Sequence, residues 1–87
     1  MKYIKNETME FLEIDDESMA IYDPDSGDTH YIDAIGIAIL SLLDEKAEEA
    51  ELIDQLCDMY DADREIIAAD VRGFLEELVG KNVVLEL

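Results

Sequence analysis

The hydrophobic pattern of the chain changes its period once, near residue 33. Before that point, short apolar runs at 9–14, 19–22 and 29–32 are separated by polar turns, which predicts three strands of an antiparallel meander. Pro24 and Gly27 lie in the turn before the third strand, where proline presets φ and glycine permits a positive φ. Residues 1–8 show no clear pattern, and we expect them to form a loose arm.

Beyond residue 33, apolar residues recur at helical spacing and predict helices at about 34–43, 47–60 and 64–79. Asp33 and Asp63 are suitable N-caps for the first and third helices. The start of the second helix is poorly marked. Gly80 stands where a C′ glycine would end the third helix, and residues 83–85 are suited to a last short strand. Because the first helix is apolar nearly all round, we expect it to be buried.

This order of elements predicts a single domain over residues 1–87. Its fold class is α+β and winged-helix-like, with a three-stranded antiparallel sheet followed by three helices. A chain of 87 residues has just enough core for itself and little room for an internal active site.

The net charge of −18, from 24 acidic and 6 basic residues, narrows the classes of partner. It argues against nucleic acid, whose affinity comes mostly from phosphate neutralisation, and against an anionic membrane surface. A basic protein or peptide partner and a simple role in solubility both stay open. The first residues lack a long apolar segment and the chain has one cysteine, so we expect no signal peptide, no internal disulfide and a cytoplasmic location.

Candidate catalytic and metal-binding residues are few. Asp23, Asp25 and Asp28 lack the glycine and the bidentate glutamate that a calcium loop of this spacing needs, so a hairpin turn is the better interpretation. Ser26 lies in that turn and not at the start of a helix, where a carrier protein holds its prosthetic arm. His30 has no neighbouring nucleophile in the pattern, and Cys57 is interpreted as a small buried hydrophobe. We therefore predict no enzyme activity, no catalytic residue, no metal and no cofactor.

Binding is the remaining chemistry, and the third strand is its best site. It carries no proline and no lysine, the usual devices that protect an exposed edge, and in a meander it would be an edge. A peptide could add to it as a further strand. Four or five hydrogen bonds would contribute roughly 4–5 kcal/mol, ordering the peptide would cost about 2–5 kcal/mol, and micromolar affinity needs about 8 kcal/mol. Apolar anchors in a groove beside the strand must therefore supply the rest, and the third helix is the candidate wall.

Several short motifs, in this order and spacing, resemble the PqqD-like family, the recognition elements for ribosomally made, modified peptides. The motifs are Ile32-Asp33-Ala34-Ile35-Gly36-Ile37, Leu42-Leu43-Asp44, Tyr60-Asp61-Ala62-Asp63, Asp70-Val71, Phe74-Leu75 and Leu78. The likeness covers about residues 11–84. Asp33 stands where the family usually has asparagine, and Glu45 where it commonly has glycine.

The resemblance implies a non-catalytic peptide chaperone. Such proteins bind the leader of a precursor peptide as an extra strand and present it to a modifying enzyme, often a radical S-adenosylmethionine enzyme, otherwise a protease or cyclase. By position, the peptide-binding residues would be Thr29, His30, Tyr31 and Ile32 on the third strand, with Arg64, Ile67, Val71 and Leu75 on the third helix. Which flank of that helix faces the groove stays open.

Two rival hypotheses belong to other classes. A winged-helix DNA-binding regulator predicts a basic recognition helix, whereas the third helix carries Arg64 and Arg72 against four acids. An acidic interaction or regulatory module, for example a dimer through the same strand edge, is the second rival.

Overall fold

The computed structural model describes all 87 residues and has an α+β fold. The predicted meander and the three helices that follow it are confirmed. The elements are β1 (Lys2–Lys5), β2 (Glu10–Asp15), β3 (Ser18–Tyr22), β4 (Thr29–Asp33), α1 (Ala34–Ser41), β5 (Ala47–Glu48), α2 (Glu49–Met59), α3 (Arg64–Gly80) and β6 (Val84–Glu86). None of the helices combines the length and the apolar character needed to cross a membrane.

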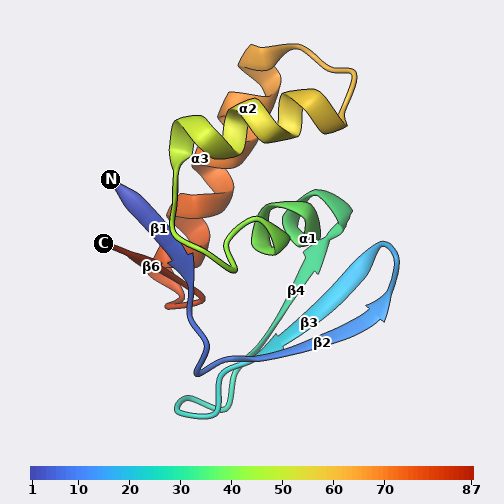
Figure 1. The fold of residues 1–87 in the computed structure, drawn as a ribbon. Coiled ribbons are helices and arrows are strands. Elements are labelled where there is room, and N and C mark those ends of the chain that lie inside the picture. Colours follow the sequence, from blue (N-terminus) through green and yellow to red (C-terminus); the bar gives the residue numbers. More distant parts are fainter.

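Strands β2, β3 and β4 form the meander, in that order and all antiparallel (Figure 1). The turn between β3 and β4 forms as its residues predict: Gly27 adopts a φ of 77° and donates its N–H to the carbonyl of Asp23 at 2.8 Å. In the register, Ala20 of β3 lies between Leu12 of β2 and Tyr31 of β4. Strand β4 has β3 on one side and no strand on the other, so it is an edge.

The expectation of a loose arm over residues 1–8 is wrong, because this segment contains β1. Strand β1 is the centre of a second antiparallel sheet of order β5-β1-β6, in which Tyr3 pairs with Ala47 and with Glu86. The backbone N–H of Leu87 also donates to the carbonyl of Lys2 at 2.8 Å. The strands that pair with β1 lie more than 40 residues away in the sequence, so no local pattern predicts this strand.

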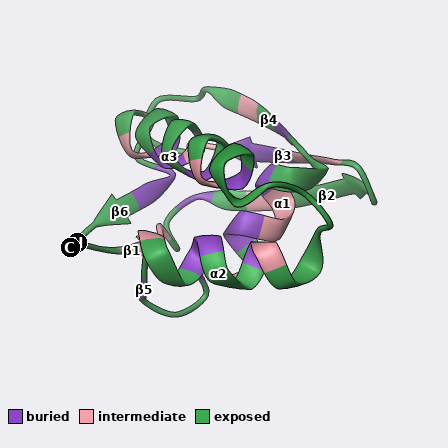
Figure 2. Cartoon of the chain, turned by 90° about the horizontal axis from the view of Figure 1, so that it is seen from above, coloured by how far each residue is buried: buried purple, intermediate pink, exposed green.

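The core lies where α1, α2 and α3 meet the inner face of the meander (Figure 2). Ile21, Ile39, Leu52 and Val71 are fully buried there. The prediction that α1 would be buried is only partly met, since Ile35 in its first turn stays 42% exposed. Asp33 caps α1 as predicted, with its Oδ1 accepting from the N–H of Gly36 at 3.0 Å.

Helix α3 ends two residues later than a C′ glycine at position 80 would require. Gly80 is still helical, and Asn82 adopts the left-handed conformation with a φ of 62°. The N–H of Asn82 donates to the carbonyl of Val79, and the N–H of Val83 donates to the carbonyl of Leu78 at 2.9 Å. These two bonds are those of a Schellman motif, in which asparagine replaces the usual glycine and leads the chain directly into β6.

Candidate functional site: the groove between β4 and α3

The free edge of β4 presents backbone groups that no other strand uses. Asp23 donates its N–H to the carbonyl of Asp28 at 2.8 Å, which makes these two residues a hydrogen-bonded pair. Hydrogen-bonded and non-bonded pairs alternate along an antiparallel ladder, so His30 and Ile32 bond to β3. The N–H groups of Thr29, Tyr31 and Asp33 therefore point away from the sheet.

A groove with three sections runs beside this edge, and we call it the β4–α3 groove. Neighbouring sections share lining residues, so the three form one continuous surface. The first, of about 240 Å³, is the strand section, lined by His30, Tyr31, Ile32, Asp33, Phe74, Glu77, Leu78 and Lys81. The second, of about 310 Å³, is the acidic section, lined by Asp33, Ile35, Ala69, Asp70, Gly73, Phe74 and Glu77. The third, of about 180 Å³, is the apolar section, lined by Ile35, Leu56, Tyr60, Ala62, Ile66, Ile67, Asp70 and Val71.

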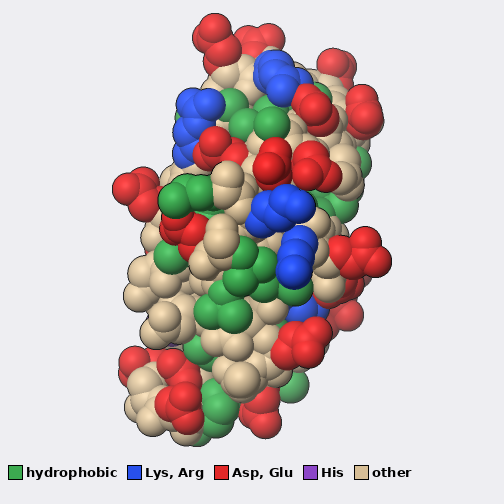
Figure 3. Space-filling view, turned by 60° about the vertical axis from the view of Figure 1, so that its left-hand side comes forward, with side chains coloured by type: hydrophobic (Ala, Val, Ile, Leu, Met, Phe, Trp, Pro, Cys, Tyr) green, Lys and Arg blue, Asp and Glu red, His purple; other side chains and the backbone are tan.

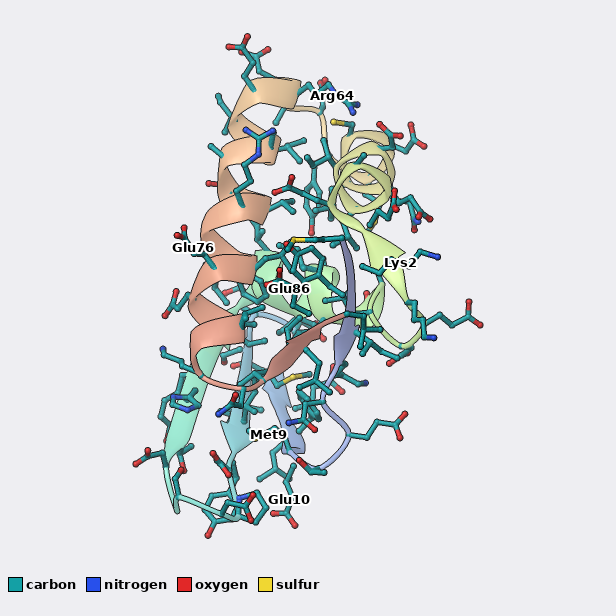
Figure 4. The ribbon with its side chains drawn as sticks, turned by 90° about the vertical axis from the view of Figure 1, so that its left-hand side faces the viewer. Lys2, Met9, Glu10, Arg64, Glu76 and Glu86 are labelled. Carbon is teal, nitrogen blue, oxygen red and sulfur yellow. The ribbon has the colours of Figure 1, made fainter.

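The direction of α3 sets the direction of the groove. The C-terminal end of α3 lies against β4 and its N-terminal end lies beside α2 (Figure 4). From Glu77 to Ile66 the helix rises about 16 Å, the length of roughly five residues of extended chain. A peptide that pairs with β4 and continues in the same line therefore passes the acidic section and reaches the apolar section.

The four β4 residues predicted from the sequence all lie at this edge. His30, Tyr31 and Ile32 line the strand section, and Thr29 begins the strand just before it. Tyr31 is 72% exposed, and its side chain belongs to the outer face of the sheet with Leu12. Ile32 is buried against the core, so it positions the strand more than it offers surface.

The four α3 residues predicted from the sequence do not come together. Ile67 and Val71 line the apolar section but are buried core residues. Arg64 is bound to Asp54 of α2, with Nη2 and Oδ1 2.6 Å apart, at the far end of α3 from β4 (Figure 4). That hydrogen bond raises the pKa of the Arg64 guanidinium above its ordinary value. Leu75 is 2% exposed and lines a different hollow, which faces β1 and β6.

The flank of α3 that faces the groove is the one that carries Asp70, Phe74, Glu77 and Lys81. Sequence reasoning chose Leu75 of this helix as a binding residue and not its neighbour Phe74. In the structure Leu75 is buried, whereas Phe74 is half-buried and lines the groove. The signal was present: Asp70, Phe74, Glu77 and Lys81 recur at intervals of three and four, as on one face of a helix.

Lysine and arginine side chains are mostly used in ion pairs. Figure 3 shows them interleaved with acidic side chains on the face that includes the termini. The pairs are Lys5 with Asp44, Arg64 with Asp54, Arg72 with Glu49, and Lys81 with Glu77. With six basic residues against 24 acids, most carboxylates have no basic partner.

Comparison with known proteins fits this architecture. The family model described as Coenzyme PQQ synthesis protein D (PqqD) matches residues 18–84, from β3 through the three helices to β6. The chain belongs to the PqqD family. The resemblance found in the sequence motifs is thereby confirmed.

The chain is also similar to one curated relative and to one solved structure. A PqqA binding protein of Gluconobacter oxydans (strain 621H) is 50% identical over 46 residues, which are 53% of this chain and 48% of that protein. The chain thus matches about half the length of that relative. The solved structure of TbiB1 in complex with the TbiA(beta) leader peptide is similar over 97% of this chain and 96% of that one, with a TM-score of 0.83 and 28% identity.

Proposed function

We propose that this PqqD-family protein binds the leader segment of a ribosomally made precursor peptide and presents it to a modifying enzyme. The whole chain, residues 1–87, acts as one recognition domain in this proposal. Support comes from the family, from a relative that is a PqqA binding protein, and from the likeness to TbiB1, which was solved with a leader peptide. The modifying enzyme is a radical S-adenosylmethionine enzyme, a protease or a cyclase.

The observation that carries the proposal is the outward direction of the Thr29, Tyr31 and Asp33 N–H groups. An extended peptide can bond to these groups and become the fourth strand of the meander. Because the meander is antiparallel throughout, we infer antiparallel addition, which also gives slightly more stable pairing.

The groove supplies what backbone pairing lacks. Backbone bonds alone leave the affinity well below the roughly 8 kcal/mol of a micromolar complex. The apolar section offers Ile35, Tyr60 and Ile66, each at least 39% exposed, to an apolar side chain of the peptide. Burying one such side chain contributes about 1.5–3 kcal/mol, so two or three anchors make up the difference.

We also propose that the protein is not an enzyme and that it works in the cytoplasm. The carboxylates of the groove, Asp33, Asp70 and Glu77, are exposed to solvent, whereas catalytic groups typically line a concave, mostly apolar pocket. The one cysteine, Cys57, is a free thiol, in keeping with a reducing compartment.

Chemical-shift mapping tests the proposal. The probes are synthetic leader segments of candidate precursor peptides from the same genome, titrated one at a time into the ¹⁵N-labelled chain. We expect the largest shifts at residues 29–33 and along Asp70, Phe74 and Glu77. A scrambled peptide of the same composition is the control. Shifts confined to the hollow around Leu75, or no shifts at millimolar peptide, would overturn the proposal.

A further inference from the structure

The acidic section of the β4–α3 groove has a composition that sets it apart from its neighbours. Its carboxylates are Asp33 from the end of β4 and Asp70 and Glu77 from α3, and no basic side chain lines it. The strand section next to it contains Lys81, and the apolar section is almost entirely hydrophobic.

The charges in this section are poorly compensated within the chain. Lys81 of the strand section pairs with one of them, its Nζ lying 2.8 Å from Oε1 of Glu77. Asp33 uses Oδ1 to accept the N–H of Gly36, a neutral donor. Asp70 takes part in none of the four ion pairs of the chain. At least two carboxylates therefore face the groove without a cationic partner.

The walls between these carboxylates suit a long side chain. Ile35 is 42% exposed and Phe74 is half-buried, so both offer apolar surface to a methylene stem. At Gly73 an added Cβ would meet no atom within 4 Å, so the α3 side of the section is open. A lysine or arginine stem can lie on this surface while its charged end reaches Asp33 or Asp70.

We propose that the acidic section is a specificity site that selects a leader with a lysine or arginine at one fixed position. This inference rests on the proposed function, because it concerns the peptide that pairs with β4. Asp33 is the last residue of β4, and the section lies between the paired strand and the apolar section. In the peptide, the basic residue therefore lies between the segment that pairs with β4 and the residue that fills the apolar section. Under antiparallel pairing, the basic residue and the apolar anchor are both N-terminal to the paired segment.

Local selection differs from the general attraction of a chain with a net charge of −18. General attraction favours any cationic peptide and weakens with salt, wherever the charge sits. A site for one residue instead fixes a position, and changing Asp70 changes the preference at that position alone. The test must separate these two effects.

The experiment is a selection from a library of displayed random 16-residue peptides. It uses the full chain as wild type, as Asp70→Lys, and as the control Glu76→Lys. Both substitutions change an exposed acid of α3 and alter the net charge equally. Glu76, however, lies with Arg72 on the other flank of α3, which faces β6. One enriched peptide is then synthesised with lysine, glutamine or glutamate at the enriched position, and the affinities are compared at low and moderate salt.

We expect aligned wild-type sequences to share an apolar residue and, C-terminal to it, one lysine or arginine column. For the synthetic peptide, replacing that lysine by glutamate should lower affinity for the wild type by about tenfold, since each exposed ion pair is worth up to about fivefold. Asp70→Lys should reverse the preference to glutamate, and Glu76→Lys should retain it.

Each other outcome contradicts a specific claim. Enriched peptides with no fixed basic column, or equal responses of Asp70→Lys and Glu76→Lys, overturn the specificity site and leave strand addition intact. A library that yields no peptide for the wild type overturns the proposed function itself, and the specificity site with it.

Discussion

The ring of Phe74 rests on the backbone of Gly36. A Cβ atom at position 36 would stand 2.5 Å from Cε2 of Phe74, closer than real Cβ contacts come, and 3.1 Å from Cβ of Ile32, which is tighter than most. Glycine at this position therefore lets α1, β4 and α3 meet at one point. Since Phe74 lines both the strand section and the acidic section, this contact sets the depth of the groove.

We predict that Gly36→Ala damages both stability and binding. The added methyl group must displace the Phe74 ring, which should lower the free energy of unfolding by about 1–3 kcal/mol and push the ring into the groove. Gly80→Ala is the matched control, because its methyl group meets open space outside the groove lining and alanine favours a helix by up to about 1 kcal/mol. Urea unfolding and leader-peptide affinity measure the two effects, and equal stability changes for the two variants would contradict the role of this contact.

Substitutions of Tyr31 separate its backbone from its side chain. Tyr31→Pro removes an N–H that points away from β3, so the chain should stay folded while peptide affinity falls below detection. Tyr31→Ala keeps the N–H and should retain most of the affinity. His30→Pro removes an N–H that bonds to β3 and should destabilise the meander itself. If Tyr31→Pro bound the leader as well as Tyr31→Ala, pairing at this edge would be excluded.

The two flanks of α3 should respond differently to truncation. Ile66→Ala removes a 57% exposed side chain from the apolar section, so stability should change by less than about 0.5 kcal/mol while leader affinity falls roughly 5- to 30-fold. Leu75→Ala removes a core side chain and should cost about 2–5 kcal/mol of stability without changing the affinity of the folded protein. Chemical unfolding and fluorescence anisotropy give the two readouts. The reverse pattern would place the groove on the other flank.

Acid should loosen the turn that precedes β4. The N–H of Asp25 donates to Oδ1 of Asp23 at 2.9 Å and holds the pKa of this carboxyl below its ordinary value of 3.8. Because the pKa is lower in the folded state, the ionised form stabilises the fold above about pH 4, and this contribution is lost as pH falls below that value. Asp23→Asn keeps the acceptor oxygen but cannot titrate, so its stability should fall less steeply between pH 4 and pH 2. Identical slopes for the two proteins would refute this role of Asp23.

The parts of the fold that the sequence predicts well are those with local causes. Pro24 and Gly27 define the turn that starts β4, and Asp33 defines the start of α1, so the open edge could be inferred before the structure. Strand β1 could not be inferred, because Tyr3 forms a strand only through pairing with the distant residues Ala47 and Glu86. The end of α3 was also predicted at the wrong residue. The left-handed conformation that ends the helix was assigned to Gly80, but Asn82 adopts it.

The candidate site likewise has one part that the sequence predicts, the strand, and one part that it does not, the helix wall. Residues 29–32 could be predicted as binding residues because the last strand of a meander is an edge, whatever the helices do. The helix wall depends on the close approach of Phe74 to Gly36, two residues 38 positions apart, and a helical wheel cannot reveal which flank that contact turns toward β4. The acidic section likewise exists only because the end of β4 brings Asp33 next to Asp70 and Glu77.

Amide hydrogen exchange along β4 distinguishes strand addition from any other mode of peptide binding. In the free protein, the amides of His30 and Ile32 should be protected by β3, while those of Thr29 and Tyr31 exchange rapidly. With saturating leader peptide, the Tyr31 amide should become about as protected as that of His30, so that the alternation along β4 disappears. A peptide that binds tightly while the Tyr31 amide still exchanges at its free rate would contradict strand addition at β4.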